Sequence, residues 1–250
     1  MKKDRHLAYI QNDPWEHLKI FSKARIALGN VGGSLPLKEV LDFRLAHAHA
    51  KDAVHSQLDI LSLKNQLETM GGTVFILKSM ALDRDQYLKR PDLGRRVHSD
   101  SKVALLKSGR EYDLVLVLAD GLSADAVNTH AAAVIKLLLP KITASFSVGM
   151  ALVSQGRVAI GDEIGKLLHA KMTAVFIGER PGLSSPSSLG IYTTYDPRPG
   201  LTDERRNCIS NIHENGMSHD DAAQNLLYLL ERSFLKGISG VNLKLDKGIT

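Results

Sequence analysis

The chain has 250 residues, of which 44% are hydrophobic and 24% charged, so it can bury a large core as one domain or as a domain with an appendage. Its net charge of +5 is modest and only 5% of residues are aromatic, which argues against nucleic-acid binding. The sequence contains no run of about 18 apolar residues, so it predicts no membrane-spanning helix. The single cysteine, Cys208, excludes an internal disulfide and fits a reducing cytoplasm.

Apolar residues at helical spacing predict that residues 1–70 form an N-terminal helical segment. Leu37, Leu41 and Leu45 are four residues apart, and Val54 and Leu58 continue the same spacing, as one face of a helix requires. The sequence "MGG" at 70–72 ends this helical pattern.

The remainder of the chain, residues 71–250, alternates short apolar runs with helical patterns. The runs predict strands at 73–79, 112–120, 146–154, 172–177 and 190–195. Helices are predicted at 101–108, 121–139, 159–170 and 218–234, with Ser123 and Ser218 as N-caps of the second and the last. This alternation predicts an α/β fold with a Rossmann-like, doubly wound and mostly parallel sheet.

Polar and glycine-rich segments follow three of the predicted strands. They are Asp120 with Gly121, residues 154–158 and residues 178–183. Because ligands bind beyond the carboxyl ends of the strands in such sheets, we expect these segments to lie along one edge. The third begins the loop "GERPGLSSPSSLG" at 178–190, which has Glu179 at its mouth.

The common catalytic and cofactor motifs are missing from the sequence. The glycines of "GNVGGSLP" lack the Gly-Lys-Ser/Thr of a P-loop, and no G-x-G-x-x-G follows a predicted strand. His47 and His49 point to different faces of a helix, so we expect no metal site there. No nucleophile signature surrounds Cys208, which reads as a small buried hydrophobe. The residues alone predict an α/β domain with a polar-edged ligand site and no catalytic residues of its own.

Several long motifs nevertheless resemble one family. The stretches "VGGSLPLKEVLDFRLAHAHAKDAVH", "LVLADGLSADAV", "QGRVAIGDEIG", "IGERPGLSSPSSLGIYTTYDPRPG" and "DERRNCISNI" occur in the order found in the small subunit of ethanolamine ammonia-lyase. The similarity extends from about residue 25 to residue 240. It implies a subunit of an adenosylcobalamin-dependent lyase that converts ethanolamine to acetaldehyde and ammonia by radical chemistry.

The resemblance also implies three cobalamin contacts in this chain. The valine of "QGRVAIGD" is Val158, the glutamate of "GERPG" is Glu179 and the cysteine of "RNCISN" is Cys208. From the residues alone, Val158 also fits the core, Glu179 a loop cap and Cys208 a packing position. Cobalamin enzymes that replace the cofactor's own base use Asp-x-His-x-x-Gly, which this sequence lacks, so the resemblance implies adenosylcobalamin bound base-on.

The partner implied is the large subunit, a TIM-like barrel that holds ethanolamine, in a hetero-oligomer expected to contain six of each chain. We expect a cytoplasmic protein with no nucleic-acid or membrane partner. Packaging in a bacterial microcompartment stays open, because "MKKDRHLAYIQNDPWEHL" leads almost directly into the matched region, whereas several members carry a longer extension. The alternatives are a non-catalytic corrinoid-binding or adaptor subunit and, more remotely, a nucleotide-dependent oxidoreductase.

Overall fold

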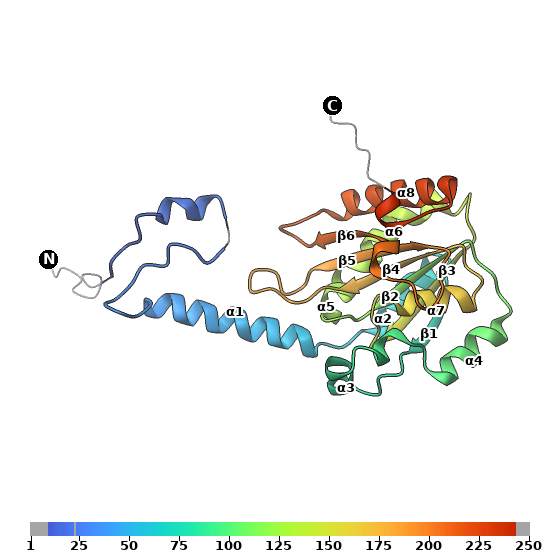
Figure 1. Ribbon diagram of the computed structural model, residues 1–250, viewed down its shortest axis with the longest axis horizontal. Helices are drawn as coiled ribbons and strands as arrows, with labels where there is room; N and C mark the ends of the chain where they lie inside the picture. The colour runs from blue at the N-terminus through green and yellow to red at the C-terminus, as the bar shows by residue number, and fades with distance from the viewer. Residues whose placement is uncertain (1–9, 23, 244–250) are drawn as a thin grey trace, which may run out of the picture.

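The computed structural model describes residues 10–22 and 24–243 and shows a β-sheet between two layers of helices, with an N-terminal arm extending from one side (Figure 1). The strands, in the spatial order β1-β3-β2-β4-β5-β6, are β1 Thr73–Lys78, β3 Val148–Ser154, β2 Leu114–Ala119, β4 Met172–Gly178, β5 Leu189–Tyr195 and β6 Arg206–Ile212. The first four pair in parallel, whereas β5 and β6 are antiparallel to their neighbours.

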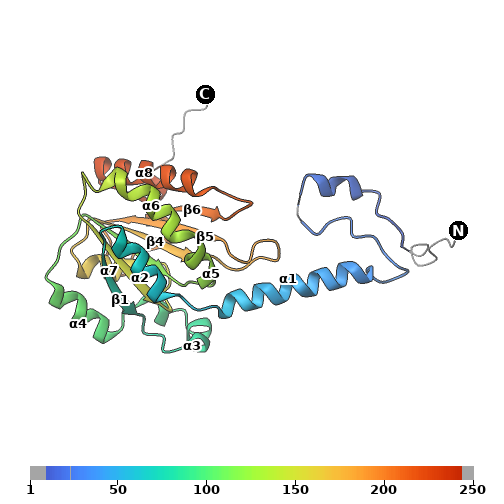
Figure 2. The ribbon, with the colours of Figure 1, turned by 180° about the vertical axis from the view of Figure 1, so that it is seen from behind.

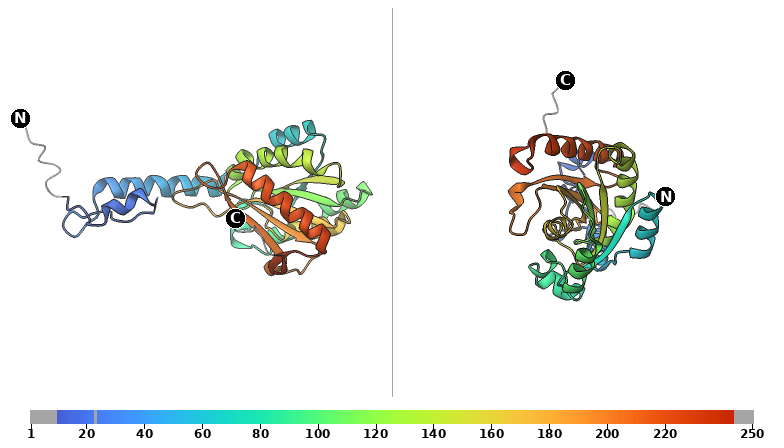
Figure 3. Two further views of the ribbon diagram at one scale, coloured as in Figure 1. Left: turned by 90° about the horizontal axis from the view of Figure 1, so that it is seen from above. Right: turned by 90° about the vertical axis from the view of Figure 1, so that its right-hand side faces the viewer.

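Helices cover both faces of the sheet, as the end-on view in Figure 3 shows. The helices are α1 Leu37–His55, α2 Ile60–Thr69, α3 Arg84–Lys89, α4 Ser99–Ser108, α5 Ala124–Ala126, α6 Ala132–Ile142, α7 Ile160–Leu167 and α8 His219–Lys236. Short helical turns are η2 Glu16–Ile20, η3 Leu93–Arg95, η4 Val127–Ala131, η5 Asp203–Arg205 and η6 Gly240–Asn242. Apolar residues of α2, α6 and α8 pack on one face, and those of α4 and α7 pack on the other.

The central strands are apolar throughout because helices cover both faces of the sheet. Every residue of β2 and β4 is buried, so these strands read as continuous hydrophobic runs rather than as an alternating pattern. The outer strand β6 exposes several residues, and its sequence alternates less clearly. The core therefore centres on β2, β3 and β4, and the carboxyl ends of these strands meet at one edge.

The α/β class and the five predicted strands are confirmed, and so is the N-cap of α8, where the Ser218 hydroxyl accepts a hydrogen bond from the Asp221 amide at 3.1 Å. The sheet is mixed, however, and β6 and α3 were not predicted. The Ser123 cap is wrong, because its hydroxyl donates to the carbonyl of Pro186 instead of capping the helix.

The predicted N-terminal helical pattern is divided into two helices. Residues between His55 and Ile60 separate α1 from α2, and the Asp59 carboxylate caps α2 by accepting from the Ser62 amide at 3.0 Å. The second helix packs its Leu63 and Leu67 side chains into the core of the sheet. By contrast, α1 projects away from the sheet, and residues 10–22 and 24–36 fold back alongside it, as the reverse view shows (Figure 2).

Candidate functional site

The three segments predicted to meet at one edge of the sheet are in contact. The Asp120 carboxylate, at the end of β2, accepts hydrogen bonds from the amides of Gln155 at 2.8 Å and Gly156 at 3.0 Å, just after β3. The carbonyl of Gly178, at the end of β4, accepts from the Leu122 amide at 2.9 Å. Asp120 therefore holds the β3–α7 loop, which carries Val158, beside the end of β2.

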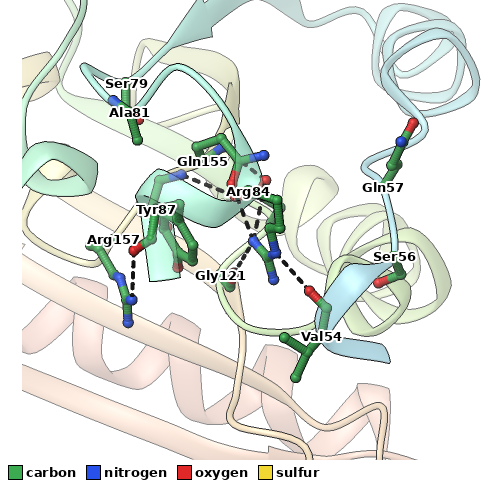
Figure 4. A network of polar contacts seen from close by, with 12 residues as sticks. Val54, Ser56, Gln57, Ser79, Ala81, Arg84, Tyr87, Gly121, Gln155 and Arg157 are labelled. Carbon is green, nitrogen blue, oxygen red and sulfur yellow. Dashed lines mark hydrogen bonds and ion pairs between the residues drawn. The ribbon is translucent and has the colours of Figure 1, made fainter. Parts of the chain in front are cut away.

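Arg84 of α3 ties this edge to the end of α1 (Figure 4). Its guanidinium donates to the carbonyls of Val54 at 2.6 Å and Gly121 at 2.8 Å, and to the Gln155 side chain at 3.3 Å. The same side chain lies 3.9 Å from the buried Asp120 carboxylate. Three segments far apart in the sequence are thus fixed to one another at the carboxyl edge.

The loop 178–190 is closed at its base and leaves one glutamate oxygen available. The Glu179 amide donates to the Ser188 carbonyl at 2.9 Å, and the Ser188 hydroxyl donates to Oε2 of the Glu179 carboxylate. The Asn211 amide donates to the same oxygen at 3.3 Å. Both of these bonds go to Oε2, so Oε1 is the oxygen that can accept from a ligand.

Residue 178, at the start of this loop, must be a glycine because two backbone carbonyl oxygens lie where a side chain would begin. A Cβ at this position would lie 1.9 Å from the Ser123 carbonyl oxygen and 2.8 Å from that of Asp120. We expect Gly178→Ala to lower the free energy of unfolding by about 1–3 kcal/mol, the usual cost of overpacking. Urea denaturation measures this loss. Gly182→Ala in the same loop is the matched control, because its Cβ would meet nothing closer than 3.6 Å; equal losses in the two variants would contradict the prediction.

The structure brings Val158, Glu179 and Cys208 around one tyrosine, Tyr192 of β5. Tyr192 and Cys208 are directly paired across the β5–β6 ladder, and Val158 lines the same cavity as Tyr192. At Gly190, a Cβ would lie 3.0 Å from Glu179 Oε1 and 3.4 Å from the Tyr192 ring, so the absent side chain makes room for the carboxylate. Residues that are up to 50 positions apart in the sequence are therefore gathered around Tyr192.

Two titratable groups on this surface are held neutral. Desolvation by the surrounding protein raises the pKa of the Cys208 thiol, and the nearby Glu179 carboxylate acts in the same direction. Desolvation also raises the pKa of Tyr192, with further contributions from Cys208 and Glu179. Cys208 is exposed, so its interpretation as a small buried hydrophobe is wrong. Because the thiolate is the reactive form, the raised pKa also makes Cys208 poorly suited to act as a nucleophile.

The cavity beside Tyr192 has a volume of about 390 Å³ and a cationic rim. It is lined by Pro91, Arg95, Arg157, Val158, Ala159, Tyr192, Leu201, Thr202, Asp203 and Arg206. The Arg157 guanidinium lies 4.2 Å from the centroid of the Tyr87 ring. The backbone amide of Arg157 donates to the Gly94 carbonyl at 2.8 Å. The Arg157 backbone is therefore held in place directly before Val158.

A buried ion pair supports the floor of the site. Arg206 of β6 donates to both carboxylate oxygens of Asp162 in α7, at 2.7 and 2.8 Å, and each side chain is only 2% exposed. Arg206 also donates to the Thr194 hydroxyl of β5 at 3.0 Å. The pair fixes β6, which carries Cys208, to the helix that follows Val158.

Sequence reasoning missed several of these residues. Tyr192 and Gly190 are two positions apart in a predicted strand, so they share a face, and that spacing was the available signal. The Asp162–Arg206 pair gave no signal in the sequence, because its members are 44 positions apart. Within residues 10–22 and 24–243, no three His, Cys, Asp or Glu side chains are placed to hold a metal ion, and no helix has the length and hydropathy needed to cross a bilayer.

The fold and the site define an α/β protein with a polar-rimmed cavity, a candidate ligand site, at the junction of the parallel and antiparallel parts of its sheet. Residues 12–244 match the family model described as ethanolamine ammonia-lyase light chain (EutC). The chain belongs to this family of ammonia-lyase subunits, which confirms the resemblance seen in the sequence.

Curated relatives agree with the family assignment. The chain is 49% identical over 246 residues to the ethanolamine ammonia-lyase small subunit of Pseudomonas putida (strain GB-1), covering 96% of this chain and 90% of the relative. It is 51% identical over 232 residues to the protein of the same name from Rhodopseudomonas palustris (strain BisA53), covering 92% and 89%. The protein of that name from Azotobacter vinelandii (strain DJ) is 49% identical over 238 residues, with 93% and 88% covered.

Proposed function

We propose that this chain is the small subunit of an ethanolamine ammonia-lyase and that it holds adenosylcobalamin, base-on, against a large catalytic subunit. The observation that carries the proposal is the convergence of Val158, Glu179 and Cys208 around Tyr192 in a chain that belongs to the family. The bound cofactor supplies radical chemistry. This chain binds and orients the cofactor, and the residues that contact ethanolamine lie on the large subunit.

The donors and acceptors at the site fit a corrin, which is a broad ring with amide side chains at its rim. Oε1 of Glu179 can accept hydrogen bonds from amide N–H groups, and a carboxylate is a strong acceptor for such donors. The half-buried Val158 and Tyr192 offer an apolar wall beside it. Arg95 and Arg157 line the adjoining cavity, and their charge suits the phosphodiester of the cofactor's nucleotide tail.

The loop 178–190 supports the proposal by being ordered before the ligand arrives. Its base is held by the bonds between Glu179 and Ser188, and the Ser123 hydroxyl donates to the Pro186 carbonyl at 3.1 Å. A loop already held in this way loses little conformational freedom on binding, which favours affinity. The exposed Cys208 is available to the ligand on the same side.

The proposal includes the organisation of the chain and of the complex. Residues 71–250 are proposed to be the Rossmann-like cobalamin-binding unit, in which the parallel strands form the doubly wound part, and residues 1–70 the N-terminal helical segment. We propose a cytoplasmic hetero-oligomer with six of each subunit.

Reconstitution tests the function. Mixing the chain with its cognate large subunit, adenosylcobalamin and ethanolamine should release acetaldehyde, whereas each subunit alone should release none. Acetaldehyde is followed by coupled reduction to ethanol, with loss of the reduced nicotinamide absorbance. A complex that binds cobalamin without turnover would identify the chain as a corrinoid-binding or adaptor subunit, and a mixture that does neither would refute the proposal.

A further inference from the structure

Helix α1 has one face covered by its own chain. The Arg25 side chain lies 5.1 Å from the centroid of the Phe43 ring and donates to the Glu39 carbonyl at 2.8 Å. Ala46 lines a hollow of about 410 Å³ together with Ala24 and Arg25, which precede the helix, and with Leu183 and Ser184 of the loop 178–190. Ala53, on the same face, is buried. The small side chain of Ala46 leaves room on this face for Ala24 and Arg25 and for the tip of the loop 178–190.

A second face of α1 is apolar and uncovered. Leu37, Leu41 and Leu45 are spaced four residues apart, so they form one stripe along the helix. Their exposed fractions are 71%, 53% and 57%, respectively. Among the 19 residues of α1, Ala53 alone is buried, so this helix gains little from the core of its own chain.

The helix is nevertheless held firmly where it joins the domain. Arg84 donates to the Val54 carbonyl (Figure 4), and the Asp125 amide donates to the Ser56 hydroxyl at 3.1 Å. The fixed end orients the rest of the helix as it projects from the sheet. An anchored helix with leucines at a four-residue spacing is the pattern by which helices dock into an apolar groove.

The position of α1 indicates which partner covers the stripe. The helix leaves the carboxyl edge of the sheet on the same side as the β4–β5 loop (Figure 1). Leu183 and Ser184, at the tip of that loop, line the hollow with Ala46 of α1. The covered face of the helix is therefore next to the loop that carries Glu179, and the leucine stripe lies on another face of the same helix, at the same end of the molecule.

We propose that the Leu37–Leu41–Leu45 stripe docks into an apolar groove of the large subunit; this inference rests on the proposed function. The large subunit must approach the Glu179 loop to enclose a cofactor shared by the two chains, and α1 lies at the flank of that approach. The curated relatives are themselves named small subunits, which fits a larger partner chain.

The test compares binding of the large subunit to the wild-type chain and to Leu41→Ser/Leu45→Ser, without cofactor, by biolayer interferometry. Loss of two leucine side chains that the large subunit would bury should weaken the affinity between the subunits by about 100-fold. The matched control is Leu106→Ser/Leu235→Ser, which removes leucines that are 60% and 76% exposed on α4 and α8, and its affinity should be close to that of the wild type. Circular dichroism and urea midpoints of the free chains should be unchanged in both variants.

The outcomes separate the two proposals. A wild-type chain that does not bind the large subunit refutes the proposed function. If the wild-type chain binds the large subunit and Leu41→Ser/Leu45→Ser binds it equally well, or no worse than the control variant does, the docking role of the stripe is refuted. The proposed function is then unaffected. Sedimentation of the free chain adds a further check, because a wild-type dimer that the stripe variant converts to monomer would assign this face to a second copy and also overturn the proposal.

Discussion

Asp162→Ala should lose about 3–5 kcal/mol of its free energy of unfolding, the cost of leaving one member of a buried ion pair without its partner. Arg206 would keep its charge inside the protein with only Asp203, Thr194 and the Leu201 carbonyl near it. Urea denaturation followed by circular dichroism gives the loss directly. The ion pair is bidentate and both side chains are 2% exposed, so solvent cannot replace the missing carboxylate.

Two further variants show whether the loss comes from the buried charge of Arg206, which would keep only the exposed Asp203 as a carboxylate partner. The exposed pair Arg90–Asp92 has a similar separation of 2.7 Å, and Asp92→Ala should cause no measurable change. The double variant Asp162→Leu/Arg206→Met should recover much of the stability, because it removes both buried charges. If Asp162→Ala were as stable as Asp92→Ala, the buried pair would not be what holds β6 to α7.

We expect Glu179→Ala to weaken cobalamin binding to the assembled complex by about 1–3 kcal/mol, the scale for a hydrogen bond to a charged group, or roughly 5- to 150-fold in Kd. The physical reason is the loss of Oε1, the carboxylate oxygen that faces Gly190 and Tyr192 rather than Ser188. Equilibrium dialysis of hydroxocobalamin against the reconstituted complex measures the affinity without requiring turnover.

The control for Glu179 is its exposed neighbour Arg180, whose replacement by alanine should leave cobalamin affinity near the wild-type value. Because Oε2 of Glu179 also binds Ser188 and Asn211, urea midpoints of the free chain separate a loosened loop from a lost contact. Unchanged affinity in Glu179→Ala would remove this residue from the site. Weaker affinity with an unchanged urea midpoint would support a direct contact.

Much of the fold could be predicted because the central strands are buried on both faces. Their apolar runs are unbroken, so β2, β3 and β4 were evident from hydrophobicity alone. The strand β6 was missed because it is an outer strand that exposes Cys208 and Asn211, and its sequence reads as a polar segment. Ser123 was misassigned because the same serine can cap a helix or bind a distant carbonyl, and only the fold brings Pro186 within reach.

The candidate site was predictable in part. The rule for carboxyl ends of strands placed Asp120, Glu179 and the loop before Val158 at one edge. The contacts of Asp120 confirm this for the loop before Val158, and the bond from the Leu122 amide to the Gly178 carbonyl confirms it for the segment that begins the Glu179 loop. Cys208 lies within a strand and obeys no such rule, so only family resemblance singled it out. Tyr192 joins the site through cross-strand pairing, and the register of an unpredicted strand could not be derived from the sequence.

The state of Cys208 has a consequence for handling and assembly of the chain. A solitary exposed thiol usually makes a protein prone to air oxidation and to covalent dimers. Both reactions proceed through the thiolate, and the raised pKa of Cys208 keeps that form scarce. We therefore expect this sulfur to be oxidised more slowly than an exposed cysteine whose pKa is not raised.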